Sequence, residues 1–342
     1  MNDWPIIQKG YNALEQASAD WHDYIVVTTK SPWELARHCM PDPNLVIFVT
    51  NLDRSKLDSL KKEATGASLI VGLGSGLSMD ANKFLAKANG MNMAQIPTTS
   101  SNNACFTRTA WTFEGDKRIA EREVPIPTQI VLDYDLIRQA PNRMNQAGSA
   151  EILCSHTALF DWKLANRAGV DVQWDDKLES ITRIELERLQ HYSDSIGRAE
   201  LDSFVKIIEV GRKFADGFTS HPKARFNAGS EHILAWAIEQ MADVRIIHGE
   251  AVSLSILIMS HIQNNNPEIV SKIIQSTKML YLPEDIGTSW DQVEKIITYL
   301  PEFSENIPWH TIITEFAKRG SDGRRELMNR FKAAKLFVQS LK

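Results

Sequence analysis

The sequence predicts an α/β domain with a parallel sheet, followed by an all-α domain. In the first part of the chain, short Val/Ile/Leu runs alternate with helical patterns; after Pro141 the strand signals fade and long amphipathic patterns continue to the C-terminus. Near-continuous apolar strands separated by helices are typical of a parallel sheet covered on both faces. Because 342 residues are enough for two domains, we expect one over residues 1–143 and a second over residues 144–342.

Each element of the first domain follows from its local pattern. Short β-branched or apolar runs predict strands at residues 25–29, 45–50, 67–72, 93–98, 106–113 and 129–133. Amphipathic stretches predict helices at residues 32–39, 55–63 and 78–89.

Helical periodicity dominates the rest of the chain. Apolar positions recur at a spacing of three to four residues in segments 150–166, 178–192, 199–214, 231–241, 248–262, 267–279, 290–300 and 323–341. Pro283, Pro301 and Pro308 are expected to separate the last of these helices.

Composition excludes several classes of protein. The formal charge is −5 and no Lys/Arg-rich run is present, so nothing favours nucleic-acid binding. Cys39, Cys105 and Cys154 are odd in number and widely spaced, which argues against a disulfide framework and for a reducing cytosol. The first residues lack the blocks of a signal peptide, and the longest apolar run, 251–259, is too short for a membrane span. We expect a cytoplasmic protein without a membrane or nucleic-acid partner.

A glycine-rich turn follows the strand expected at residues 67–72. It reads Val71-Gly72-Leu73-Gly74-Ser75-Gly76-Leu77-Ser78-Met79-Asp80 and opens the next helix. Glycines let the backbone approach a phosphate, and the free N–H groups of a helix start favour an anion. The pattern is neither a Walker A loop nor the G-x-G-x-x-G fingerprint. It predicts either a phosphate site or a tight turn without a ligand.

A second polar loop supports the phosphate interpretation. Residues 97–103 read Pro-Thr-Thr-Ser-Ser-Asn-Asn and follow the next expected strand. In an open parallel sheet, loops at the carboxyl ends of strands line the ligand crevice. Two such loops in succession favour a nucleotide site.

Two histidines and an upstream glutamate form a candidate metal site. His248 lies sixteen positions after His232, and Glu151 precedes both. Imidazole nitrogens and a carboxylate oxygen suit a cation such as zinc, and three protein ligands leave a coordination position open for substrate or water. A histidine pair in a helical domain is more often structural, so the prediction depends on the three residues converging.

These segments together resemble the iron-containing alcohol dehydrogenase superfamily, which includes glycerol dehydrogenase, glycerol-1-phosphate dehydrogenase and 3-dehydroquinate synthase. Residues 72–83 are similar to the GxGGGxxxDxAK signature of glycerol-1-phosphate dehydrogenases, with Ser75 and Asn82 as mismatches. Pro97-Thr98-Thr99 with Thr107 looks like part of the PTTxxxxSExT stretch of iron-type alcohol dehydrogenases.

The histidine segments extend the resemblance. Gly229-Ser230-Glu231-His232 is similar to the first histidine segment of glycerol-1-phosphate dehydrogenases. His248-Gly249-Glu250-Ala251-Val252 and Ala150-Glu151 look like 3-dehydroquinate synthase. The resemblance covers roughly residues 25–260, in the expected order.

The resemblance implies a dehydroquinate synthase-like fold with a Rossmann-like first domain. It also implies a divalent metal, zinc or alternatively iron or nickel, on Glu151, His232 and His248 in the cleft between the domains. NAD or NADP would bind the glycine-rich turn and the second polar loop, through Gly72, Gly74, Ser75, Gly76, Ser78, Asp80, Thr98, Thr99 and Thr107. The metal would polarise a carbonyl or alkoxide oxygen while the nicotinamide exchanges a hydride with the adjacent carbon.

The chain departs from every branch of the superfamily. Dehydrogenases usually carry Asp where this chain has Glu151, and synthases carry a substrate-binding Lys where it has Cys154. Asn103 replaces the Asp of glycerol-type dehydrogenases, and because an amide cannot act as a general base, a proton relay would use His156 or water. His156 can equally be a residue that only caps or packs. Trp236 stands where a second histidine often follows the first ligand and is expected in the core.

These features predict a metal-dependent, NAD(P)-linked oxidoreductase of a small polyol, hydroxy-ketone or polyol phosphate. One alternative is a 3-dehydroquinate synthase-like sugar-phosphate cyclase that uses NAD transiently, although the Lys missing at the position of Cys154 argues against it. Another is a relative that keeps the fold without activity. Lys223 and Arg225 either bind an acidic group of the substrate or lie in a solvated loop. We expect a small-molecule substrate and a homo-oligomer.

Overall fold

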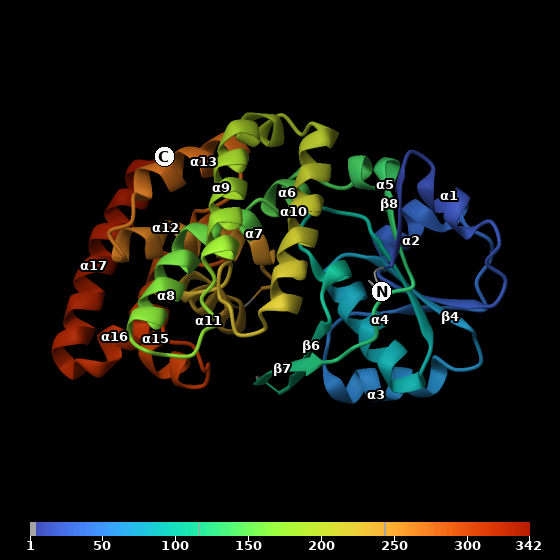
Figure 1. Ribbon diagram of the computed structural model, residues 1–342, viewed down its shortest axis with the longest axis horizontal. Helices are drawn as coiled ribbons and strands as arrows, with labels where there is room; N and C mark the ends of the chain where they lie inside the picture. The colour runs from blue at the N-terminus through green and yellow to red at the C-terminus, as the bar shows by residue number, and fades with distance from the viewer. Residues whose placement is uncertain (1–4, 116, 243) are drawn as a thin grey trace. The chain divides into compact units, whose positions relative to one another are not determined.

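The computed structural model describes residues 5–115, 117–242 and 244–342, and it divides the chain into two units. The first unit ends at Pro141 and the second runs from Asn142 to Lys342. Strands occur only in the first unit, among the residues just given, and the second is built from helices (Figure 1). The predicted fold class, an α/β part followed by an all-α part, is therefore confirmed.

A parallel sheet of six strands forms the centre of the first unit. Its strands are β1 (Ile6–Gly10), β2 (Tyr24–Thr28), β3 (Leu45–Phe48), β4 (Leu69–Gly74), β5 (Asn92–Pro97) and β8 (Gln129–Asp133). They pair in the order β1-β8-β5-β4-β2-β3, and every pair is parallel. β4 and β5 are neighbours, so the loops that follow them leave the same edge of the sheet.

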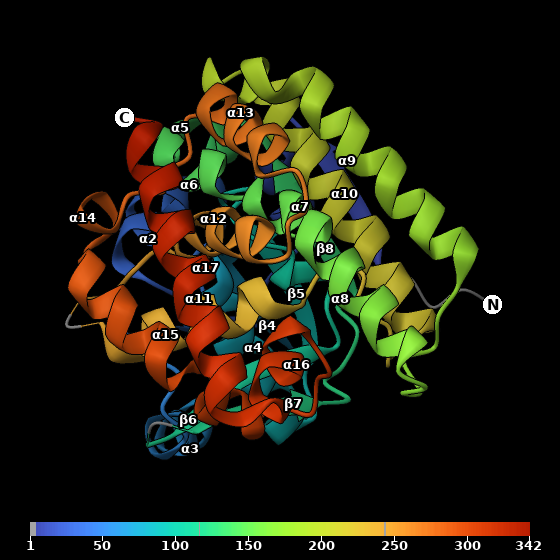
Figure 2. The same cartoon turned by 90° about the vertical axis from the view of Figure 1, so that its left-hand side faces the viewer.

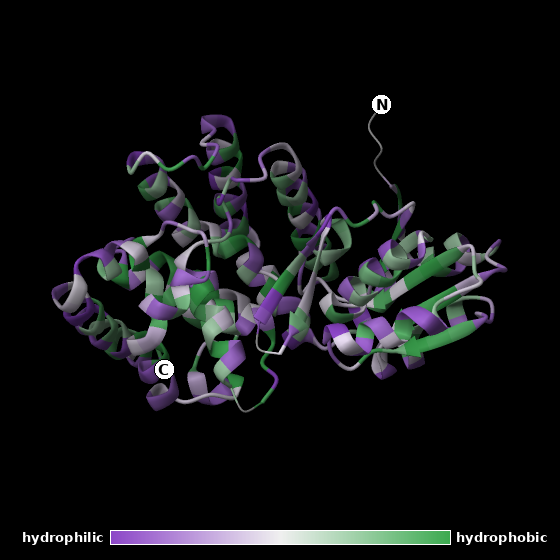
Figure 3. Ribbon diagram, turned by 90° about the horizontal axis from the view of Figure 1, so that it is seen from below, coloured by the Kyte–Doolittle hydropathy of each residue, from purple (hydrophilic) through white to green (hydrophobic). Residues whose placement is uncertain are grey.

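Helices cover both faces of this sheet. They are α1 (Ala13–Ser18), α2 (Lys30–Ala36), α3 (Arg54–Glu63), α4 (Gly76–Asn89) and α5 (Tyr134–Gln139), with 3-10 turns at Arg37–Cys39 and Ala104–Phe106. On one face, Ile25 packs in a core with Leu57 of α3. On the other face, Val26 packs with Leu14 of α1. Successive residues of β2 thus enter opposite cores, which explains why the buried strands of the sheet are rich in apolar residues (Figure 3).

The structure differs from the strand predicted at residues 106–113. Phe106 ends the 3-10 turn, and the strand there is β6 (Thr109–Glu114). β6 pairs antiparallel with β7 (Lys117–Arg122) in a separate two-stranded sheet. β1, whose Ile6 is 71% exposed, was not predicted from the sequence, because a short edge strand lacks the apolar run of a buried one.

The second unit contains twelve helices within its described residues. They are α6 (Asn142–Ala147), α7 (Ala150–Leu153), α8 (Ser155–Arg167), α9 (Asp176–Gly197), α10 (Leu201–Ser220), α11 (Ser230–Met241), α12 (His248–Ile262), α13 (Pro267–Thr277), α14 (Pro283–Ile286), α15 (Trp290–Glu305), α16 (Ile312–Lys318) and α17 (Gly320–Ser340). The helix expected at 150–166 is divided into α7 and α8. Pro301, expected between helices, lies inside α15.

Helix α12 forms the middle of the second unit. Apart from His248 and His261, all its residues are buried. It packs against α11 and α17, which lie on either side of it in the chain (Figure 2). A helix that is apolar nearly all round belongs in a core, and α12 therefore gives the His248 end of the helix a fixed support.

Two expectations about the whole chain can be compared with the structure. All three cysteines are free, as their number and spacing indicated. Among the residues that the structure describes, no helix has both the length and the apolar character needed to cross a bilayer.

Candidate metal and nucleotide sites

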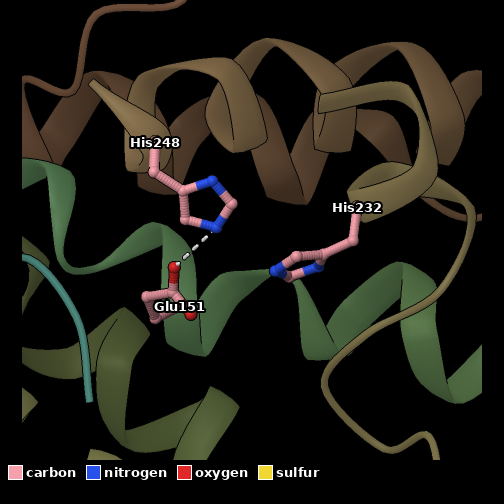
Figure 4. Close-up of side chains that lie close together, drawn as sticks. All are labelled: Glu151, His232 and His248. Carbon is pink, nitrogen blue, oxygen red and sulfur yellow. Dashed lines mark ion pairs between the residues drawn. The ribbon is translucent and has the colours of Figure 1, made fainter. Parts of the chain in front are cut away.

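Glu151, His232 and His248 converge in the helical unit (Figure 4). Glu151 lies in α7, His232 in the first turn of α11, and His248 is the first residue of α12. One ligand atom from each side chain lies within 4.8 Å of the other two. His248 Nε2 is 3.2 Å from Glu151 Oε1, and the two imidazole ring centres are 5.5 Å apart. The three residue types and their spacing match a three-ligand cation site.

A glycine beside His248 makes this convergence sterically feasible. A Cβ atom at Gly249 would lie 2.1 Å from the backbone oxygen of Ala147, at the end of α6. Only a residue without a side chain therefore allows the start of α12 to approach the segment between α6 and α7. Because Glu151 follows Ala147 by one turn, this close approach brings His248 near its carboxylate.

In both histidines, the Nδ1 atom lies within hydrogen-bond distance of a glutamate carboxylate. His232 Nδ1 is 2.8 Å from Glu231 Oε1, and His248 Nδ1 is 2.5 Å from Glu239 Oε1. An ionised carboxylate can only accept hydrogen bonds, so Nδ1 carries the hydrogen in both rings. Neither glutamate was predicted from the sequence to belong to the site. The position of Glu231 next to His232 was a visible signal, whereas the pairing of Glu239 with His248 depends on how α11 meets α12.

The charges around His248 favour a cation. Burial alone would lower the pKa of its imidazole, but the carboxylates of Glu239 and Glu151 outweigh burial and raise that pKa to about 10. When no metal is bound, a proton on His248 supplies the positive charge that these carboxylates stabilise. A divalent cation at the same place would meet the same field.

Cys154 lies next to the site without being a good ligand. Its Sγ, Glu231 and His232 form a second group of neighbouring ligand atoms. Burial, followed by the charges of Glu231 and Glu151, raises the pKa of Cys154 well above its usual value, and the thiol donates to the Asn227 carbonyl at 3.1 Å. A metal ligand must be a thiolate, so Glu151, His232 and His248 are the better set.

In the other unit, the glycine-rich turn joins β4 to α4. Gly74 has φ +138°, a conformation that L side chains rarely adopt, and a Cβ there would lie 2.7 Å from Ser78 Oγ. Ser75 is the N-cap of α4 and Gly76 its first residue. Gly72 lies within β4, where a Cβ atom would lie 2.5 Å from Gln95 Oε1 and 2.8 Å from Asn82 Nδ2. The expected strand, glycine turn and helix start are all present.

The second polar loop lies beside this turn. Thr98 donates its backbone N–H to the Gly74 carbonyl at 2.8 Å, and both Thr98 and Thr99 are buried. Thr99 Oγ1 bonds Ser101 Oγ at 2.7 Å, within its own loop. Asn103 precedes the 3-10 turn and accepts from the Phe106 N–H at 2.9 Å. The structure thus brings the two loops together at adjacent strand ends.

Lys83 connects the residues expected to contact a nucleotide. Its side chain is fully buried, and its ammonium donates to Asp80 Oδ1 at 2.9 Å, Thr107 Oγ1 at 2.9 Å and the Thr109 carbonyl at 2.8 Å. Asp80 and Thr107 therefore already have a role in holding the turn. Lys83 was not among the predicted site residues, although it is the last residue of the 72–83 motif.

His156 does not join the cluster of Glu151, His232 and His248. Its Nε2 lies 2.6 Å from the Asn265 carbonyl, and Asn265 Nδ2 donates to the His156 carbonyl at 3.0 Å. These two bonds fasten α8 to the loop between α12 and α13. The interpretation of His156 as a packing residue fits these contacts, and the interpretation as a proton relay does not.

The aromatic and basic residues near His232 also have their own partners. Trp236 is half-buried rather than part of the core, with ring centres 5.7 Å from His232 and 5.1 Å from Trp309. The Arg225 guanidinium stacks 5.1 Å from the Trp309 ring, and Lys223 pairs with Asp171. Lys223 and Arg225 line a cavity of about 190 Å³ with Asp161 and Trp162, among other residues.

Comparisons with known proteins indicate a family. A family model described as iron-containing alcohol dehydrogenase matches residues 42–141. The glycerol-1-phosphate dehydrogenase of Aeropyrum pernix is 24% identical over 230 residues, which is 67% of this chain and 65% of that enzyme. That of Hyperthermus butylicus is 26% identical over 236 residues, 69% of this chain and 67% of the enzyme. The aligned region thus spans about two thirds of these relatives.

Solved structures show the same fold. A probable glycerol dehydrogenase from Sinorhizobium meliloti superposes with a TM-score of 0.77 at 17% identity, covering 98% of both chains. The glycerol dehydrogenase from Schizosaccharomyces pombe also gives 0.77, at 16% identity, covering 99% of this chain and 90% of that one.

Proposed function

Because the chain belongs to the iron-containing alcohol dehydrogenase superfamily, we propose that it is a metal-dependent, NAD(P)-linked dehydrogenase. Its substrate would be a small polyol, a hydroxy-ketone or a polyol phosphate, with glycerol 1-phosphate as the first candidate because of the enzymes it resembles. The observation that carries the proposal is the convergence of Glu151, His232 and His248 from three helices, in a chain that also has a glycine-rich strand-to-helix turn.

The residues present fit a divalent metal. The Nε2 atoms of His232 and His248 and the carboxylate of Glu151 would hold it, since Nδ1 of each ring already faces a glutamate. Zinc suits this mixed nitrogen and oxygen set, and iron or nickel are the alternatives. A bound metal would polarise the substrate oxygen and make a hydroxyl more acidic. We propose that the released proton passes to water, because Asn103 cannot act as a base and His156 is engaged by Asn265.

The glycine-rich turn would bind the phosphates of the nucleotide. The first turn of α4 presents free N–H groups, and Gly74 and Gly76 add no side chain of their own there. Ser78 Oγ is buried and has no hydrogen-bond partner among the described residues. We propose Ser78, with the turn residues Gly72, Gly74, Ser75 and Gly76, as nucleotide contacts. Thr98 and Thr99 would border the same site, while Asp80 and Thr107 hold the turn through Lys83.

Absorbance of the reduced nicotinamide tests this function. The purified chain, loaded with zinc, iron or nickel, would be mixed with NADH or NADPH and with a panel of ketones and their phosphates. We expect steady oxidation of the cofactor with at least one of them. Product formation without net change in the cofactor would instead support the cyclase alternative.

Two substitutions connect that activity to the metal site. Glu151→Ala and His248→Ala each remove one of the three ligands, so both should abolish turnover and metal binding. His191→Ala is the matched control, because His191 is exposed on α9 and bonds the Glu187 carbonyl. Wild-type activity in both ligand variants would contradict the metal assignment.

A further inference from the structure

We infer that Glu231 and Glu239 are positioning residues of the metal site: each fixes which nitrogen of its histidine faces the metal. The inference rests on the proposed function and adds two residues to it. A neutral imidazole can carry its hydrogen on either nitrogen, and only the nitrogen without it can bind a metal. A carboxylate that accepts from Nδ1–H leaves Nε2 as the ligand atom.

The contact between Glu231 and His232 is not a by-product of helix geometry. Neighbouring residues on a helix point about 100° apart and do not face each other. Here the glutamate turns toward the ring because its other contacts hold it there: Oε1 also accepts from the Gly229 N–H at 2.7 Å, and Oε2 accepts from Thr157 Oγ1 at 2.8 Å. Glu231 is completely buried. His232 therefore meets a carboxylate that cannot move away.

The contact between Glu239 and His248 has a different origin. Glu239 lies two turns after His232 on α11, whereas His248 begins α12 after a connecting loop. The 2.5 Å contact thus fastens the start of one helix to the end of the other. His248 is bracketed by two carboxylates, Glu239 at Nδ1 and Glu151 at Nε2. Glu151, at Nε2, is itself a proposed metal ligand, whereas Glu239 contacts the nitrogen that faces away from the metal site.

Histidines away from the cluster bond differently. His22 and His191 each have Nδ1 on a backbone carbonyl, and His156 has Nε2 on one. His310 pairs with Glu315 through Nε2, at 2.9 Å, and neither residue belongs to a metal-ligand group in the part of the chain that is described. Nδ1–carboxylate pairing thus marks the two histidines that converge with Glu151.

Zinc affinity of the metal-stripped protein tests the inference. Glu239→Gln keeps the length of the side chain but removes its charge, and Glu239→Ala removes the acceptor. Loss of such a partner typically costs about 10–100-fold in metal affinity. In competition with a chromophoric chelator, we expect the zinc Kd of E239Q to rise by about tenfold and that of E239A by about a hundredfold. The metal-free variants should lose some thermal stability, because the pair also joins α11 to α12, so zinc affinity is compared per folded molecule.

Glu315→Gln is the matched control, because it makes the same change in a histidine–carboxylate pair outside the cluster. Its zinc affinity should equal that of the wild type. Nitrogen-15 spectra of labelled histidine provide a second readout. The metal-loaded wild type should show His248 bound through Nε2 with hydrogen on Nδ1, and E239A should lose this single tautomer.

The outcomes separate this inference from the proposed function. If His248→Ala binds zinc as tightly as the wild type, the metal site itself is wrong and the inference is overturned with it. If His248→Ala loses zinc but E239Q and E239A both keep wild-type affinity and tautomer, only the positioning role is overturned. Glu231→Gln is a poorer test, because its buried carboxylate also supports the backbone of Gly229.

Discussion

In the first unit, the candidate nucleotide site comes from two loops that are close together in the sequence, whereas in the second unit the candidate metal site comes from three helices. The turn from β4 to α4 depends on its backbone path, which Gly74 makes accessible. The metal cluster depends on side chains, and further carboxylates hold the two histidines. Backbone sites leave a contiguous pattern in the sequence, while side-chain sites leave scattered residues whose meaning emerges only after folding.

Gly249→Ala gives the largest expected effect. It tests whether the metal cluster also depends on the close backbone approach between α12 and the end of α6. The new Cβ would lie 2.1 Å from the Ala147 oxygen, a backbone atom that cannot rotate aside. We expect a loss of about 3 kcal/mol in the free energy of unfolding, measured by denaturant titration, and weaker zinc binding.

Gly323→Ala is the control for this change. Its Cβ would lie 2.0 Å from the Phe316 oxygen, a similar collision in the same unit but away from the cluster. It should destabilise the protein without changing zinc affinity per folded molecule. Equal effects of both variants on zinc binding would show that Gly249 has no specific role in forming the metal site.

Gly74→Ala tests whether the candidate nucleotide site depends on the backbone conformation of its turn. Because φ is +138° at this residue, an alanine would be strained by about 2 kcal/mol, and it would also crowd Ser78 Oγ. Stability and NADH affinity, the latter from fluorescence titration, should both fall. Gly10→Ala is the matched control, since Gly10 has φ +147° but open space around its Cβ position. An NADH affinity equal in both variants would show that the turn is not a nucleotide site.

Ser78→Ala has the smallest expected effect on folding. Its buried hydroxyl has no hydrogen-bond partner among the residues described, so its removal should stabilise the nucleotide-free protein by at most about 1 kcal/mol. NADH affinity should decrease nonetheless, because the variant lacks the hydroxyl that is proposed to contact the nucleotide.

Ser253→Ala supplies the comparison in the other unit. Ser253 Oγ is buried in α12 and likewise lacks a partner within the described part of the chain. This variant should gain similar stability and keep its NADH affinity. Unchanged NADH affinity in Ser78→Ala would withdraw Ser78 from the nucleotide site.

The fold was predictable because its signals are local. The buried strands β2, β4, β5 and β8 and the helix α12 were found within a few residues, since each has an unbroken apolar run or stripe. β1 and the β6–β7 hairpin were missed or misplaced, because their exposed faces carry polar residues and their pairing depends on distant segments.

The site was predictable to a smaller extent. Glu151, His232 and His248 were identified from chemistry and resemblance, and the structure brings them together. Glu239 could not be found, because nothing in the sequence states that the end of α11 faces the start of α12. The burial of Lys83 could not be predicted from the sequence either, because a lysine on a helix is ordinarily expected to reach solvent.

Lys83 also joins parts of the first unit that are separate in the sequence. Its ammonium joins helix α4, through Asp80, to the Thr107 side chain and the Thr109 carbonyl at the start of β6. All three of its hydrogens are donated to acceptors, and its burial leaves no water to replace them. The glycine-rich turn and the root of the β6–β7 hairpin are therefore mechanically coupled, so a displacement of the hairpin would be transmitted to the first turns of α4.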